Sequence, residues 1–263
     1  MADAAECAAV SARCAGRLSN ASDEWRRPVC REGRLAPPSA EYEKTGNALL
    51  NRLFGAVLHD VPWNGDRNGA IRALADRLRS EGRNPYVVPY GVSDGLGAVG
   101  YASTVAEIAQ QSSAAGLVPE AIVHCSGSGA TQAGLVVGAR RALPDTRVVG
   151  IDIDAEPERV RGDVVIYAKS AAALLDQPFD ESDVEVVAGH AGPAYGVAHE
   201  ATVEAIKLGA GLEGLVLDPV YSGKGLAGLI ALVRGGRWTK GQDIVFIHTG
   251  GAPSLFAYRH LFD

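Results

Sequence analysis

From residue 44 onward, the apolar positions of the chain switch repeatedly between two spacings. In residues 66–81 apolar side chains recur every three or four positions, with Ile71, Leu74 and Leu78 on one face, which predicts an amphipathic helix. Elsewhere, short apolar runs without polar alternation predict strands that are buried on both faces. Such strands, alternating with helices, are typical of a parallel α/β sheet. We expect helices at residues 47–54, 66–81, 101–111, 133–140, 200–208 and 224–234, and strands at 56–61, 85–89, 121–123, 147–153, 215–217 and 243–248.

Two regions do not follow this alternation. Residues 1–43 combine an Ala-rich start, which is compatible with a helix, with scattered charges and prolines that predict weakly ordered chain. Residues 155–190 show no clear period and are expected to be less regular. The strands before and after the glycine-rich turn at 91–97 suggest two lobes. We therefore expect a poorly matched N-terminus at 1–43, a small lobe at 44–95 and a large lobe carrying the site at 96–263.

Composition excludes several classes of protein. The 263 residues are 47% hydrophobic and 21% charged, as in a globular protein. A net charge of −6 gives no electrostatic argument for binding nucleic acid or an anionic membrane. The first thirty residues lack a signal-peptide core, and no apolar run reaches the ~18 residues of a membrane span. The four cysteines have no C-x-x-C pair, so we expect neither a metal site nor a redox pair. Without a signal-peptide core or a membrane span, the expected protein is cytoplasmic, with reduced thiols.

The most informative stretch follows the apolar run at 121–123. Of the six residues Ser126, Gly127, Ser128, Gly129, Ala130 and Thr131, five are Gly, Ser or Thr. A loop of such small residues before a helix lets backbone N–H groups and the helix dipole hold an anion, which suggests a phosphate cradle. In this interpretation Gly129 leaves room for the phosphate. The alternative is an ordinary turn with a Ser/Thr cap, and the loop alone does not decide between them. No Lys follows as in a nucleotide-triphosphate loop, and the glycine spacing misses G-x-G-x-x-G by two residues.

Two further polar, glycine-rich turns follow expected strands. Tyr221 stands between the expected strand at 215–217 and the expected helix at 224–234, and Thr249 follows the expected strand at 243–248. The alternative for each turn is a helix cap. In a parallel sheet, however, the carboxyl ends of the strands share one edge, where α/β proteins build their sites. Three such turns therefore predict one site at this edge.

These motifs resemble the D-cysteine desulfhydrase and 1-aminocyclopropane-1-carboxylate deaminase family. The resemblance covers residues 46–256, about four-fifths of the chain. It is carried by five segments: Thr45-Gly46-Asn47-Ala48-Leu49-Leu50, Gly97-Ala98-Val99-Gly100-Tyr101, the loop at 126–135, Leu217-Asp218-Pro219-Val220-Tyr221-Ser222-Gly223-Lys224, and His248-Thr249-Gly250-Gly251-Ala252-Pro253. Members of this family bind pyridoxal phosphate. The resemblance implies two three-layer αβα lobes with parallel sheets, the tryptophan synthase β-like fold (fold type II), in a homodimer.

The resemblance also assigns roles by position. Residues 126–131 would hold the cofactor phosphate through backbone N–H groups and the hydroxyls of Ser128 and Thr131. Thr249 would face the pyridine nitrogen. A hydroxyl there leaves this nitrogen less fully protonated than a carboxylate would, so the cofactor withdraws electrons less strongly. Tyr221 and Tyr195 lie where the family keeps tyrosines near the substrate. A phenol whose pKa is lowered near the cofactor would serve as general acid or base. For Tyr195, a half-buried packing tyrosine is the alternative.

One departure from the family pattern affects the expected activity. The family carries an Asn-Lys pair whose lysine forms the Schiff base, followed by a Ser-Asn-His segment. Neither is present, because the five lysines (Lys44, Lys169, Lys207, Lys224 and Lys240) all follow other residues. Lys224 belongs to the Tyr-Ser-Gly-Lys motif and opens a helix, so we do not assign it as the Schiff-base residue. The expected protein is a family member that lacks the N-terminal part.

The expected parent activity is elimination or deamination of a small amino acid. D-Cysteine, giving pyruvate, sulfide and ammonia, is the first choice of substrate. Ring-opening deamination of 1-aminocyclopropane-1-carboxylate is the second, and cysteate desulfonation is the third. The alternative from another class is a non-catalytic remnant that at most binds pyridoxal phosphate or phosphate weakly.

Overall fold

The computed structural model describes residues 27–32, 44–61 and 65–263. It contains two compact units. One comprises the described residues up to Val88 together with Gly250–Asp263, and the other comprises Pro89–Thr249. All nine candidate site residues fall in the second unit.

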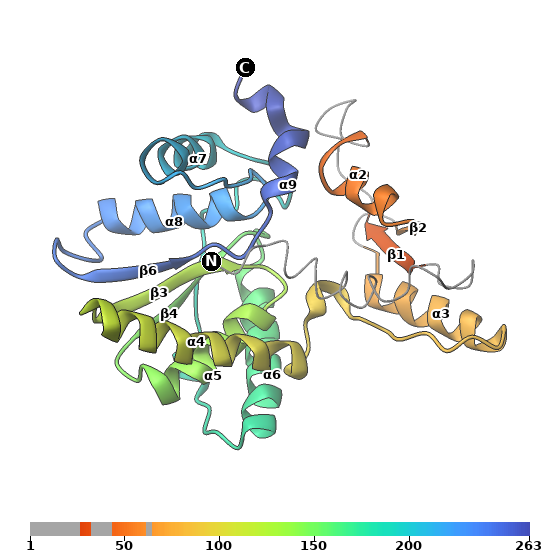
Figure 1. The fold of residues 1–263 in the computed structure, drawn as a ribbon, viewed down its shortest axis with the longest axis horizontal. Coiled ribbons are helices and arrows are strands. Elements are labelled where there is room, and N and C mark those ends of the chain that lie inside the picture. Colours follow the sequence, from red (N-terminus) through yellow and green to blue (C-terminus); the bar gives the residue numbers. More distant parts are fainter. Residues whose placement is uncertain (1–26, 33–43, 62–64) are drawn as a thin grey trace. The chain divides into compact units, whose positions relative to one another are not determined.

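The second unit is built on a four-stranded parallel sheet. Its strands are β3 (Pro119–Ser126), β4 (Arg147–Asp152), β5 (Glu185–Val187) and β6 (Asp243–Ile247), in the order β5-β4-β3-β6. The helices α4 (Gly95–Ala115), α5 (Ala130–Ala142) and α6 (Pro157–Leu175) lie on one side of the sheet, and α7 (Glu200–Glu213) and α8 (Ser222–Arg234) lie on the other (Figure 1). Two single-turn 3-10 helices, η2 (Tyr90–Val92) and η3 (Glu181–Asp183), complete this unit. The result is a three-layer αβα arrangement.

The core explains why apolar and polar residues do not alternate in the inner strand β3. Ile122 of β3 packs with Leu135 on the α5 side, whereas Val123 packs with Trp238 on the α8 side. Glycine is required where helices meet closely. A Cβ at Gly134 of α5 would lie 2.0 Å from the Ala98 carbonyl oxygen of α4, so the two backbones approach only without a side chain there.

The first unit contains a short parallel pair of strands. β1 (Arg27–Glu32) pairs with β2 (Ala56–Val61), and α2 (Gly46–Leu53) and α3 (Arg67–Ser80) accompany them. The C-terminal α9 (Ala252–Leu255) and η4 (Phe256–Leu261) belong to the same unit, and Asn47 Nδ2 of α2 donates to Ser254 Oγ of α9 over 3.0 Å. The division expected from the sequence, at residues 95/96, therefore differs from that of the structure. A return of the last fourteen residues to the first unit is a tertiary contact that no local pattern encodes.

Most elements predicted from the sequence are confirmed, including the parallel α/β class. Three expectations were wrong. Residues 85–89 form no strand, since their two prolines lack N–H groups for a ladder. Residues 215–217 form no strand either, although Leu217 is buried. The supposedly less regular stretch at 155–190 contains the 19-residue α6 and the strand β5.

The N-terminal expectation is only partly open to comparison. Within residues 1–43, residues 27–32 form β1, which was not predicted, and residues 1–26 and 33–43 lie outside the described part of the chain. In that described part, no helix is both long and apolar enough to cross a bilayer.

Candidate active site

The glycine-rich loop joins the end of β3 to the start of α5. Ser126 is the last residue of β3, and Gly129, with φ at +94°, is the N-cap of α5. No side chain caps this helix, so the alternative of a Ser/Thr cap does not hold here. The first N–H groups of α5 therefore remain available to an anion. The buried Ser126 Oγ also has no hydrogen-bond partner. An uncapped helix start beside an unpartnered buried hydroxyl fits a phosphate group.

Glycine is required at position 129 for a reason other than the expected one. A Cβ at this position would lie 3.1 Å from Val164 N and 3.3 Å from Asp163 Cβ, both on α6. Glycine is thus required by the positive φ and by the packing of the loop against α6, and the phosphate is not needed to explain it. A Gly129→Val variant would disturb this packing and is not a clean test of phosphate binding.

Carboxylates near the loop are paired with one arginine. Asp154 lies beside Gly127, and Asp163 lies beside Gly129. Arg159 forms ion pairs with Asp154, Glu156 and Asp163, the last at 2.9 Å. Unpaired carboxylates would repel a phosphate, so Arg159 offsets the charge of these three. Asp152, the register partner of Ser126, has a buried Oδ2 without a hydrogen-bond partner, and burial raises its pKa.

A buried carboxylate shapes the turn that carries Tyr221. Asp218 is fully buried and accepts hydrogen bonds from the backbone N–H groups of residues 220, 221 and 222, over 2.8–3.0 Å. It also accepts one from Ser222 Oγ at 2.7 Å. Burial raises the pKa of Asp218, and these hydrogen bonds lower it. The sequence analysis quoted Asp218 only as part of a motif and missed its role, although Asp four residues before a helical Ser is a recognisable turn signal.

Tyr221 meets the other two motifs through its hydroxyl group. Tyr221 Oη donates to the Cys125 carbonyl oxygen over 3.2 Å, next to the cradle. Thr249 Oγ1 donates to Tyr221 Oη over 3.0 Å. This direction is required, because the single Tyr221 proton is committed to a carbonyl that only accepts. The three motifs expected to share one sheet edge are therefore joined by a chain of hydrogen bonds.

The structure raises the pKa of Tyr221. Burial raises this pKa well above its usual value, while the Thr249 hydrogen bond acts in the opposite direction. The expectation of a phenol whose pKa is lowered near the cofactor concerns the bound cofactor and stays a prediction. A phenol that keeps its proton is suited to donate it, not to accept another.

Tyr195 lies in an irregular segment between β5 and α7. Tyr195 is 40% exposed, and its electrostatic effect is a small contribution to the raised pKa of Tyr221. The printed contacts therefore join Tyr221 to Thr249 and to the end of β3, whereas the place of Tyr195 in the site stays a prediction. Among the described residues, no group of three His, Cys, Asp or Glu side chains could hold a metal ion.

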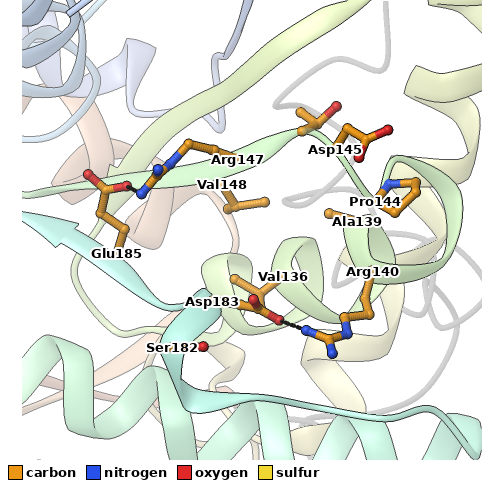
Figure 2. A pocket seen from close by; sticks show the side chains of 11 residues that line it. Val136, Ala139, Arg140, Pro144, Asp145, Arg147, Val148, Ser182, Asp183 and Glu185 are labelled. Carbon is orange, nitrogen blue, oxygen red and sulfur yellow. Dashed lines mark hydrogen bonds and ion pairs between the residues drawn. The ribbon is translucent and has the colours of Figure 1, made fainter.

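A separate cavity of about 450 Å³ lies at the opposite edge of the sheet. Figure 2 shows it between the end of α5, which carries Arg140, and the start of β4, which carries Arg147. Its arginines are paired, Arg140 with Asp183 at 2.6 Å and Arg147 with Glu185 at 3.0 Å. None of the candidate site residues lines this cavity.

Comparison with known proteins places these features in a family. Residues 36–250 match a family described as "Pyridoxal-phosphate dependent enzyme". Over 230 residues the chain is 39% identical to the 1-aminocyclopropane-1-carboxylate deaminase of Burkholderia vietnamiensis, covering 84% of this chain and 67% of that protein. Over 229 residues it is 38% identical to the D-cysteine desulfhydrase of Salmonella newport, covering 87% of this chain and 69% of that protein.

Two solved structures are similar to the chain. A homologue of 1-aminocyclopropane-1-carboxylate deaminase superposes with a TM-score of 0.79 at 31% identity, covering 95% of this chain and 72% of the other. O-ureido-L-serine synthase superposes with a TM-score of 0.61 at 16% identity, covering 90% and 68%. The second likeness concerns the fold alone.

Proposed function

Because this chain belongs to the family of pyridoxal-phosphate-dependent enzymes, we propose that the carboxyl edge of its β3–β6 sheet is a pyridoxal phosphate site. The proposed parent reaction is α,β-elimination of D-cysteine to pyruvate, sulfide and ammonia. The observation that carries this proposal is the series of hydrogen bonds from Thr249 through Tyr221 to Cys125, which ends beside the uncapped start of α5.

Each candidate residue has a proposed part in the site. The backbone N–H groups of residues 126–131, with the hydroxyls of Ser128 and Thr131, would hold the cofactor phosphate. When bound, the cofactor supplies the electron sink for breaking bonds at the substrate α-carbon. Thr249 would face the ring nitrogen. Tyr221, which keeps its proton, would donate it to the leaving group, and Tyr195 would carry a proton to or from the substrate α-carbon.

The chemistry of Thr249 and Tyr221 favours D-cysteine over the other substrates. An uncharged hydroxyl near the ring nitrogen supports a weaker electron sink than a carboxylate would. A weaker sink is sufficient when the leaving group is a thiol that a neutral phenol protonates. Opening a cyclopropane ring breaks a carbon–carbon bond and requires more electron withdrawal. The deamination of 1-aminocyclopropane-1-carboxylate is therefore the second candidate, supported by a relative of that name, and cysteate desulfonation is the third.

The lysines of this chain argue for impaired catalysis. None of the five follows an Asn, and four are exposed. The fifth, Lys224, is buried, and its ammonium group donates to two backbone carbonyls. We propose that the cofactor is held here without a covalent bond, with low or no turnover. The alternative function that this observation favours is non-catalytic binding of pyridoxal phosphate.

We expect pyridoxal phosphate to bind this chain reversibly. Pyridoxal, which lacks the phosphate, should bind at least ~10-fold more weakly, since charge-assisted hydrogen bonds are each worth about 1.5–3 kcal/mol. After borohydride treatment and dialysis, intact-mass spectrometry should show no cofactor on a site lysine. Equal affinity for the two ligands, or a stoichiometric adduct on Lys224, would contradict this assignment.

Pyruvate release from D-cysteine above the level given by free cofactor would show that turnover persists.

We also propose a homodimer located in the cytoplasm. Support for both comes from the family to which the chain belongs. Light scattering of the purified chain measures the oligomeric state directly.

A further inference from the structure

Lys224 is the largest fully buried side chain among the described residues. It lies in the first turn of α8, three residues after Tyr221, where the sequence predicts only a helix start. Its side chain does not reach solvent. Lys224 Nζ donates to the Ala194 carbonyl oxygen over 2.9 Å and more weakly to the Ile153 carbonyl oxygen over 3.4 Å. A buried ammonium group is costly, so these contacts call for an explanation.

The two acceptors belong to different parts of the sheet edge. Ile153 directly follows β4, and its N–H donates to the Ser126 carbonyl oxygen over 3.1 Å, at the cradle. Ala194 directly precedes Tyr195, in the segment 188–199, which contains neither helix nor strand. The same Ala194 carbonyl oxygen accepts from Val197 N–H over 3.2 Å. Lys224 therefore connects the Tyr195 segment to the strand end beside the cradle.

The surrounding charges keep this group an ammonium near neutral pH. Burial lowers the pKa of Lys224 to about 8, whereas the carboxylates of Asp154, Asp218 and Asp152 act to raise it. These carboxylates come from the end of β4 and from the turn before α8. From the start of α7, His199 also faces Lys224, and the pKa of His199 is lowered by burial and by the Lys224 charge. The charged donor is therefore the main form at pH 7.

We propose that Lys224 is a positioning residue that fixes the segment carrying Tyr195 against the sheet edge, and so sets Tyr195 relative to Tyr221. The importance of Tyr195 rests on the proposed function. One four-residue motif, Tyr221-Ser222-Gly223-Lys224, then has two tasks. Its first residue supplies one phenol, and its last residue, through a backbone carbonyl, places the other.

The experiment compares the wild-type chain with Lys224→Met, which keeps the length of the side chain and removes its donors. Hydrogen exchange is measured at the Val197 amide, with Lys207→Met on the exposed face of α7 as the matched control. We expect exchange at Val197 to be about 10-fold faster or more in Lys224→Met, as for the loss of a charged hydrogen bond, and unchanged in the control. Unchanged exchange in Lys224→Met would overturn the proposal.

A spectroscopic readout separates positioning from general stability. With 3-fluorotyrosine incorporated, the Tyr195 resonance, assigned by Tyr195→Phe, should shift or broaden in Lys224→Met. The resonance of Tyr86, which belongs to the first unit and is 87% exposed, should stay in place. A Tyr195 resonance identical to wild type would contradict the proposal.

A measurement on the wild-type chain covers the case in which the variant does not fold. The Lys224 ammonium should give a slowly exchanging ¹⁵Nζ resonance at neutral pH, coupled across the hydrogen bond to the Ala194 carbonyl carbon. If the protons of all lysine ammonium groups exchange rapidly with water, the hydrogen bond from Lys224 to Ala194 does not exist and the proposal is overturned. None of these measurements uses cofactor or substrate, so a failure of cofactor binding would count against the proposed function alone.

Discussion

Replacing Asp218 with alanine is expected to lower the free energy of unfolding by about 3–5 kcal/mol. Its carboxylate is fully buried and accepts from three backbone N–H groups and from Ser222 Oγ. Removing it leaves these donors buried without acceptors, and each such donor costs about 1–3 kcal/mol. The expected loss of stability is smaller than the sum over the four donors, because the turn relaxes and water reaches some of them. Urea unfolding followed by circular dichroism measures the change.

The matched control for Asp218→Ala is Asp76→Ala on α3. Asp76 pairs with Arg79 at 2.7 Å, but the side chain of Asp76 is 73% exposed. Exposed ion pairs contribute at most about 1 kcal/mol, so this control should unfold close to the wild type. An Asp218→Ala variant as stable as the control would show that the carboxylate does not hold the Tyr221 turn.

Replacing Tyr221 with phenylalanine is expected to reduce turnover of D-cysteine by ~100-fold or more, while the cofactor remains bound. The comparison requires a form of the protein that carries the family's Asn-Lys lysine and turns over. Phenylalanine lacks the hydroxyl proton, which Tyr221 donates to the Cys125 carbonyl oxygen in the protein without substrate. Burial keeps this phenol protonated, so its loss removes a proton donor without removing a charge.

The informative comparison for Tyr221→Phe is Tyr195→Phe in the same background. If Tyr221 donates to the leaving group, its variant should lower kcat and leave cofactor affinity within about twofold. If Tyr221→Phe kept a normal kcat while Tyr195→Phe had a strongly reduced kcat, Tyr195 and not Tyr221 would be the proton donor.

Much of the site could be predicted from the sequence because its signals are local. The glycine-rich loop at 126–131 begins at the last residue of β3, and only His248 separates Thr249 from the end of β6. In a parallel sheet, adjacency in the fold then comes from topology alone. The structure pairs His124 with Ile247, so the two strand ends lie side by side as expected.

The charged groups of the site could not be predicted in the same way. The burial of Asp218 and Lys224 depends on what packs over them, and most aspartates and lysines are exposed. From the sequence, Lys224 was placed only as a residue that opens a helix. Its acceptors, Ile153 and Ala194, lie 71 and 30 residues away in the sequence, beyond the reach of any local pattern.

The missed elements have physical reasons too. In α6 the β-branched run Val164-Val165-Ile166 and Gly162 weaken the helix propensity, although Val160, Val164, Ala168 and Ala171 are buried at a helical spacing that was available as a signal. β5 has only three residues, and its strand conformation depends on backbone pairing with the neighbouring strand β4. β1 likewise depends on its pairing with β2.

The most direct test of the central claim is a crystal structure of the chain with pyridoxal phosphate. The account predicts that the phosphate lies against the N–H groups of residues 127–131 at the start of α5, with the ring directed toward Thr249. A phosphate bound instead between Arg140 and Arg147, in the cavity at the opposite edge of the sheet, would contradict the account.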